Sequence, residues 1–156
     1  MSQTISPIPP GFHTLTPYLI VPDGKAAIAF YQNAFGATVH NFEATPDGKF
    51  LNAELNIGTS KVMLGEHAIE IPPVDSANLP AVSIYMYVED VDATWANAVA
   101  AGAHVLYPLS DRFYGNREGG VRDPFGVTWW IASRIAELTS EEVVKLAAEH
   151  FNQSGS

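Results

Sequence analysis

The chain has 156 residues, of which 47% are hydrophobic and 16% charged, and its formal net charge is −9 with only eight Lys and Arg residues. This composition is typical of one ordered globular domain, because a chain of this length buries roughly 68–70% of its unfolded surface. The acidic balance argues against a nucleic-acid partner, since phosphates need a basic patch. It is compatible with a cationic ligand, although net charge by itself speaks mainly to solubility.

The sequence also predicts neither a targeting segment nor thiol chemistry. No run of about 18 apolar residues occurs, so neither a membrane span nor a membrane partner is expected. Residues 1–12 lack the basic flank and apolar core of a secretion signal and are predicted to form a Pro-rich arm. The chain has no cysteine, which excludes disulfides and thiolate metal sites and favours a cytoplasmic location.

The first half of the chain predicts a strand, a helix and three further strands. An alternating strand is expected over 15–21, and a helix runs from Asp23, which can cap its start, to Gly36, which supplies the residue past its end. The three strands that follow are predicted at 37–45, 49–57 and 60–65, with a turn at 46–48 between the first two.

The second half repeats this order after a linker at 67–80, which contains two adjacent prolines and shows no periodicity. A strand is predicted over 82–88, a helix from Asp90 to Gly102, and strands at 103–109, 117–122 and 127–133. A last helix starts near Thr139, which stands at capping-box spacing from Glu142. We therefore expect an arm at 1–12, one domain at 13–135 (module one 13–66, module two 81–135), and a C-terminal helix and tail at 136–156.

A shift of 67 residues lays Asp23 on Asp90 and superposes the strand and helix patterns of the two halves. A long unit present twice predicts an α+β fold of two βαβββ modules related by a pseudo-twofold axis, with a cleft between them. Alternation then assigns the strand faces. The faces expected to meet the helices carry Leu15, Pro17, Leu19, Val21, Val62, Leu64, Val82, Ile84, Met86, Val88, Trp129 and Ile131. Those expected to face the cleft carry Thr14, Thr16, Tyr18, Ile20, Met63, Ser83, Tyr85, Tyr87 and Trp130.

Four segments carry a resemblance to a known superfamily: AAIAFYQNAFGA (26–37), VMLGEH (62–67), YVEDVDATWANAVAAGA (87–103) and DRFYGNREGGVRDPFGVTWWIAS (111–133). They resemble a PhnB-like member of the vicinal oxygen chelate superfamily, which includes glyoxalase I, extradiol dioxygenases and bleomycin-resistance proteins. The resemblance covers about residues 13–135 and implies the paired βαβββ fold and a homodimer. It does not specify an activity, because one fold can host several unrelated functions.

In the metalloenzymes of that superfamily, the resemblance implies a divalent ion held by His and Glu, sometimes Gln, at four positions. The motifs place those positions at Thr16, Met63, Ser83 and Trp130, and the 67-residue repeat relates them in two pairs. Hydroxyl, thioether and indole groups are poor ligands for such ions. We therefore expect no metal and no cofactor. In related sequences a His often follows the DPFG motif, whereas this chain has Val127.

The residues expected at the cleft admit two interpretations. Met63 and Trp130 can simply fill the space where a metal would lie, since Met is a natural gap-filler. Alternatively, Trp130 with Tyr18, Tyr85 and Tyr87 forms an aromatic floor for a flat or cationic ligand.

The loop at 111–117 also admits two interpretations. Arg117 or Arg112 could hold an anion with Tyr114 as a lid, or Arg117 could pair with Asp111 or Asp123 as a structural contact.

Three hypotheses of function follow. The first is a metal-independent protein that holds a small organic molecule in the cleft, by analogy with bleomycin-resistance proteins. The second is a metal-dependent glyoxalase-like lyase, isomerase or dioxygenase with displaced ligands, for which Glu66, His67 and His40 are candidates. The third is a metal-free enzyme that uses Arg117, Tyr114 or Glu66. No GxSxG elbow, P-loop or GxGxxG motif supports a further class of chemistry.

Overall fold

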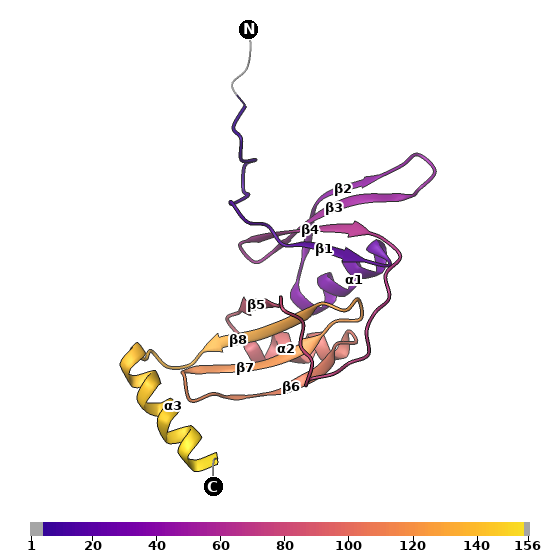
Figure 1. Ribbon diagram of the computed structural model, residues 1–156. Coiled ribbons are helices and arrows are strands. Elements are labelled where there is room, and N and C mark those ends of the chain that lie inside the picture. The colour runs from indigo at the N-terminus through magenta and orange to yellow at the C-terminus, as the bar shows by residue number, and fades with distance from the viewer. Residues whose placement is uncertain (1–4, 155–156) are drawn as a thin grey trace. The chain divides into compact units, whose positions relative to one another are not determined.

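The computed structural model describes residues 5–154, so the first four residues of the predicted arm and the last two of the tail lie outside the described part of the chain. The described elements follow one another in the order β1-α1-β2-β3-β4-β5-α2-β6-β7-β8-α3 (Figure 1). The chain divides into two units, one ending at Ile71 and the other beginning at Pro72. Each unit contains one four-stranded sheet and one helix packed on it.

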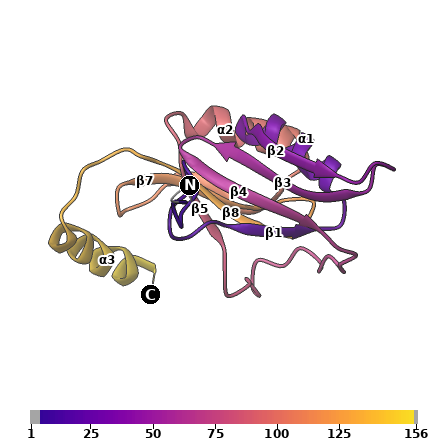
Figure 2. The same ribbon diagram turned by 90° about the horizontal axis from the view of Figure 1, so that it is seen from above.

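The first unit is a βαβββ module whose strands lie in the order β1-β4-β3-β2. Strand β1 runs parallel to β4, and the remaining neighbours are antiparallel. Helix α1 packs against β3 and β4, and Figure 2 shows the sheet with β1 and β2 at its two edges. Its elements are β1 (Tyr18–Val21), α1 (Gly24–Phe35), β2 (Thr38–Ala44), β3 (Phe50–Ile57) and β4 (Ser60–Glu66).

The second unit repeats this topology, with the strand order β5-β8-β7-β6 and a parallel β5–β8 pair. Helix α2 packs against β8, β6 and β7. Its elements are β5 (Ile84–Tyr87), α2 (Val91–Ala100), β6 (His104–Asp111), β7 (Asn116–Arg122), β8 (Thr128–Arg134) and α3 (Ser140–Ser154). The predicted pair of βαβββ modules and the C-terminal helix are confirmed.

The helix boundaries follow from the capping residues. The side chain of Asp23 accepts a hydrogen bond from Ala26 N (3.0 Å), and that of Asp90 accepts one from Ala93 N (3.1 Å). Both carboxylates thus satisfy an otherwise unpaired N–H group in the first helical turn. Helix α1 ends at Gly36, whose φ of 67° lies in the left-handed region that glycine adopts without steric cost.

The 67-residue repeat extends to the strand register. Tyr18 pairs with Met63 across β1 and β4, and Tyr85 pairs with Trp130 across β5 and β8. Each second-module residue follows its first-module counterpart by 67 positions. The equivalence inferred from sequence therefore holds for individual backbone pairs.

Burial follows the predicted alternation wherever the residues lie inside a strand. Leu19 and Val21 are buried on β1, as are Val62 and Leu64 on β4 and Trp129 and Ile131 on β8. These residues face α1 or α2 and form the cores of the two modules.

Leu15 and Val82, which were predicted to face the helices, are 87% and 76% exposed. That prediction is wrong for both residues, because β1 begins only at Tyr18 and β5 only at Ile84. Residues ahead of the paired ladder are not held by the pleat, so alternation does not fix their faces.

The core of the second module depends on one glycine and one buried carboxylate. A Cβ at Gly119 would lie 2.4 Å from the indole of Trp95, so the absence of a side chain lets α2 approach β7 closely. Asp123, which is 1% exposed, accepts hydrogen bonds from Phe125 N (2.9 Å), Val127 N (3.0 Å) and Trp129 Nε1 (2.8 Å). It thereby ties the β7–β8 turn to the largest core side chain.

Helix α3 is held to the second sheet through the β6–β7 loop. Thr139 Oγ1 accepts a hydrogen bond from Glu142 N (3.2 Å), which is the predicted cap. The ring of Phe113 stacks on that of His150 at 4.9 Å between centroids. Among residues 5–154, no helix is both long and apolar enough to cross a membrane.

Replacing Asp123 by Ala is expected to lower the free energy of unfolding by about 3 kcal/mol or more, because it leaves two buried donors and one half-buried donor without their acceptor. Urea denaturation followed by circular dichroism measures this loss. The control is Asp47→Ala in the exposed β2–β3 turn, which should cost much less. Equal losses in the two variants would contradict the role assigned to Asp123.

Candidate functional site

Strand β7 sends its side chains alternately to the two faces of the second sheet. Gly119 and Val121 face α2, as the closeness of Gly119 to Trp95 shows. By the same alternation, Asn116, Glu118 and Arg122 project from the opposite face. That face, turned away from the helix, is where the polar and aromatic groups gather.

Four aromatic side chains lie on this face. Tyr85 and Tyr87 of β5 are neighbours at 5.1 Å between ring centroids, and Tyr107 of β6 stacks on Trp130 of β8 at 5.2 Å with an interplanar angle of 23°. The indole of Trp130 lies across Gly120, where an added Cβ would come within 2.9 Å of the ring. We call the surface formed by Tyr85, Tyr87, Tyr107, Trp130 and Glu118 the aromatic face.

A buried carboxylate lies beneath Tyr85. Glu118 is 2% exposed, and its Oε2 accepts a hydrogen bond from the Tyr85 hydroxyl at 2.9 Å. Asn116 Nδ2 donates to the same hydroxyl oxygen, also at 2.9 Å. Glu118 Oε1 is buried and makes no hydrogen bond of normal geometry within the described chain, although the Tyr114 hydroxyl lies close enough to interact with this carboxylate. Burying an acceptor without a hydrogen bond costs free energy, so a donor brought to this oxygen would stabilise the complex.

The two tyrosines near Glu118 are held in their neutral forms. Burial raises the pKa of Tyr85 to about 12, an effect that the Asn116 hydrogen bond opposes and the Glu118 carboxylate reinforces. Burial also raises the pKa of the Tyr114 hydroxyl, and Glu118 adds to the rise. Both hydroxyls therefore serve as hydrogen-bond donors at neutral pH and not as bases.

The four positions that the resemblance assigns to metal ligands carry Thr16, Met63, Ser83 and Trp130. Thr16 precedes β1 and is half-buried, Met63 lies half-buried in β4, and Ser83 is exposed just before β5. Trp130 spreads its ring over Gly120. Among residues 5–154, no three His, Asp or Glu side chains converge on a point that could hold an ion. The donor set does not fit a divalent cation.

The candidates for a displaced metal site have other contacts. Glu66 Oε2 accepts a hydrogen bond from Gly24 N (2.7 Å), so it supports the start of α1. His40 lies 3.9 Å from Glu54 on the neighbouring strand. His67 follows β4 and is exposed.

In the first module, Tyr18 covers the face of its own sheet. A Cβ at Gly65 would meet the Tyr18 hydroxyl, which shows that the ring lies along β4 on the face away from the core. Tyr18 is half exposed and pairs with Met63 in the ladder. These two residues thus form a smaller counterpart of the Tyr85–Trp130 pair, within the first module.

Arg117 is not brought together with the aromatic residues. It projects toward α2, where its guanidinium contacts Asp92 at 2.8 Å and Asp111 at 3.1 Å. Of the two carboxylates considered from the sequence, Asp111 is a partner, whereas Asp123 is bound to the β7–β8 turn. Arg117 therefore supports the packing of α2, and it does not lie on the aromatic face.

The comparisons with known proteins place the chain in a family. The sequence model of the Glyoxalase/Bleomycin resistance protein/Dioxygenase superfamily matches residues 11–131. An uncharacterized protein of Mycobacterium tuberculosis (strain H37Rv) is 36% identical over 135 residues, covering 83% of this chain and 79% of the relative. The chain belongs to the Glyoxalase/Bleomycin resistance protein/Dioxygenase superfamily.

Solved structures agree with this fold. An Arabidopsis thaliana gene product, At5g48480, is similar with a TM-score of 0.57 and 28% identity, covering 78% of this chain and 98% of that one. The PhnB protein from Bacillus cereus is similar with a TM-score of 0.62 and 18% identity over 78% of this chain and 99% of that one. The predicted resemblance to the superfamily is confirmed by the family model, and the solved structures share its fold.

Sequence reasoning missed Glu118, Asn116 and Tyr107 as members of the site. The signal was present in the alternation of β7, because Val121 had to face the core and Glu118 lies an odd number of positions away. Tyr107 had no such signal, because the β6–β7 register shifts on either side of it.

The raised pKa of Tyr85 predicts a specific dependence of stability on pH. The unfolded chain loses the Tyr85 proton near pH 10, whereas the folded chain keeps it up to about pH 12. The free energy of unfolding should therefore fall as pH rises from 10 to 12.

Tyr85→Phe should make this fall shallower, and Tyr85→Phe/Tyr114→Phe shallower still. Chemical denaturation of each variant at pH 8 to 12 measures the slopes. At pH 8 to 9 the curves should run parallel. Identical slopes in all three proteins above pH 10 would contradict the burial of these hydroxyls.

Proposed function

We propose that the protein binds a small organic molecule without the help of a metal ion, and that the aromatic face receives it. The observation that carries the proposal is Glu118 Oε1, a buried acceptor that makes no hydrogen bond of normal geometry within the described chain, placed beneath Tyr85. A ligand that brings a donor to this oxygen would satisfy it.

The ligand class follows from the groups on the face. Tyr85, Tyr87, Tyr107 and Trp130 offer ring faces that attract flat or cationic groups. No Lys, Arg or His lies within 4 Å of the Glu118 carboxylate in the part of the chain that the structure describes. The preferred ligand is therefore a small aromatic compound that carries an ammonium or a similar hydrogen-bond donor.

The alternative of a metal-dependent lyase, isomerase or dioxygenase is less well supported. The positions at which the resemblance implies His, Glu or Gln carry Thr16, Met63, Ser83 and Trp130, so this alternative needs a metal site elsewhere. No observation favours a displaced site, since Glu66 already binds the start of α1. A homodimer and a cytoplasmic location stay predictions of the sequence.

Glu118→Gln should remove the preference for a cation. Phenethylamine and the uncharged 2-phenylethanol serve as probes, with quenching of Trp fluorescence as the readout. We expect wild-type protein to bind the amine roughly 10–100-fold more tightly than the alcohol, the range given by a hydrogen bond to a charged group. In Glu118→Gln the two affinities should become similar.

The exposed Glu137→Gln variant, which changes the net charge equally, should keep the wild-type preference. An equal affinity of wild-type protein for amine and alcohol would contradict the role of Glu118.

The metal-independent part of the proposal has its own test. Elemental analysis of protein purified without chelator should find zinc, nickel, manganese and iron far below one atom per chain. Incubation with these ions should leave the melting temperature unchanged, because no group of ligands stabilises the folded state by binding them. A stoichiometric ion, or a marked rise in the melting temperature with one of them, would contradict the proposal.

A further inference from the structure

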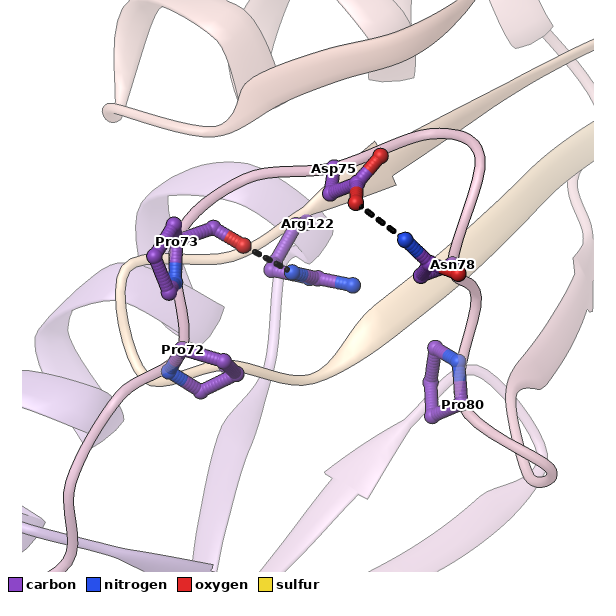
Figure 3. Close-up of a pocket in the computed structure, with 7 residues that line it drawn as sticks. Pro72, Pro73, Asp75, Asn78, Pro80 and Arg122 are labelled. Carbon is purple, nitrogen blue, oxygen red and sulfur yellow. Dashed lines mark hydrogen bonds between the residues drawn. The ribbon is translucent and has the colours of Figure 1, made fainter.

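A second site lies in the same unit, at the end of β7 and under the segment 72–80. The structure has a cavity of about 300 Å³ there, lined by Pro72, Pro73, Asp75, Asn78, Arg122 and Gly126 together with Pro80. Figure 3 shows the Arg122 guanidinium lying between Pro73 and Asn78, with the segment curving around it. This volume is at the lower end of the range for small-molecule pockets.

Arg122 is a buried cation without an ion-pair partner. It is 4% exposed, and no carboxylate lies within 4 Å of it among residues 5–154. Its Nη1 donates a hydrogen bond to the Pro73 carbonyl at 2.9 Å, whereas its Nε is buried and has no partner in the described chain. Burial of a charge is costly unless the charge is paired, so this guanidinium lacks an anion.

Asp75 does not form an ion pair with Arg122. Its Oδ1 accepts from Ala77 N (2.8 Å) and its Oδ2 from Asn78 Nδ2 (2.6 Å), so the carboxylate closes the turn of the segment. The hydrogen bonds from Asn78 and Ala77 are the main causes of the lowered pKa of Asp75, and the charge of Arg122 contributes least. The hydrogen bond to Pro73 anchors the segment but occupies only Nη1. Arg122 lines the cavity, and its Nε stays without a partner in the described chain.

The wall around the guanidinium is preformed. Asp75 fixes the turn, and the Tyr107 hydroxyl donates to the Ser76 carbonyl at 2.9 Å, which ties the segment to β6. Three proline rings supply apolar, rigid surface beside the charge. Such a pocket suits the apolar body of a ligand, and a guanidinium edge matches a carboxylate in shape and charge.

We infer that this pocket binds a small organic carboxylate, with its charged group on Arg122 and its apolar part against Pro72, Pro73 and Pro80. The site is distinct from the one proposed at Glu118, because the two depend on charges of opposite sign. Binding of the carboxylate at this pocket involves no chemical step and no metal ion.

Benzoate is the probe, with benzyl alcohol as its uncharged counterpart and inorganic phosphate as an anion without an apolar body. Isothermal titration calorimetry gives the affinities, and the ¹⁵N–¹H resonance of Arg122 Nε reports the site directly. We expect benzoate to bind and to shift this resonance, and benzyl alcohol and phosphate to bind at least tenfold more weakly. No binding of benzoate at 20 mM, or equal binding of either counterpart, would overturn the inference.

Two variants separate the site from its surroundings. Arg122→Gln should abolish benzoate binding. Asp75→Asn should strengthen it roughly two- to fivefold, because it removes a negative charge that competes with the ligand while keeping a turn-forming side chain.

The Asp75→Asn variant keeps the inference testable if Arg122→Gln fails to fold, since an unchanged or weakened affinity in that variant would overturn it. Glu118→Gln should leave benzoate binding as it is, so failure of the Glu118 proposal and failure of this one can be told apart.

Discussion

The placement of β7 against α2 determines which residues lie on the two proposed binding surfaces. Trp95 fits against the backbone of Gly119, and this contact fixes which face of β7 meets the helix. Because side chains alternate along a strand, Arg117 is then committed to α2, and Glu118 and Arg122 to the other face. A one-residue slip would exchange these roles and bury Arg117 where Glu118 now lies.

The outer face of β7 thus carries two buried charges of opposite sign. Glu118 and Arg122 are four residues apart, a separation of about 13 Å along a strand, and neither has a counterion within 4 Å in the described chain. In most proteins such groups are paired. The contrast with Arg117 is informative, because that residue is exposed enough to reach solvent and still has two carboxylate partners. On the helix side of β7 the charged residue Arg117 is paired, whereas on the other side Glu118 and Arg122 have no counterion within 4 Å in the described chain.

The repeat of 67 residues made much of the fold predictable. It works because the same physical units recur: an aspartate that caps a helix, an apolar helical stripe, and strands that alternate against it. The shared register of Tyr18–Met63 and Tyr85–Trp130 follows the same offset. Alternation failed only at Leu15 and Val82, where no neighbouring strand holds the backbone.

The two βαβββ modules, the helix caps and the poor metal ligands Thr16, Met63, Ser83 and Trp130 could be read from the sequence, because periodicity and residue chemistry are local properties. The folded chain was needed to show that Arg117 pairs with Asp92, that Glu118 lies under Tyr85, and that the segment 72–80 contacts Arg122. These contacts join residues 25 to 49 positions apart. No local pattern encodes them, since they depend on how strands are ordered in the sheet and on where a non-periodic segment comes to rest.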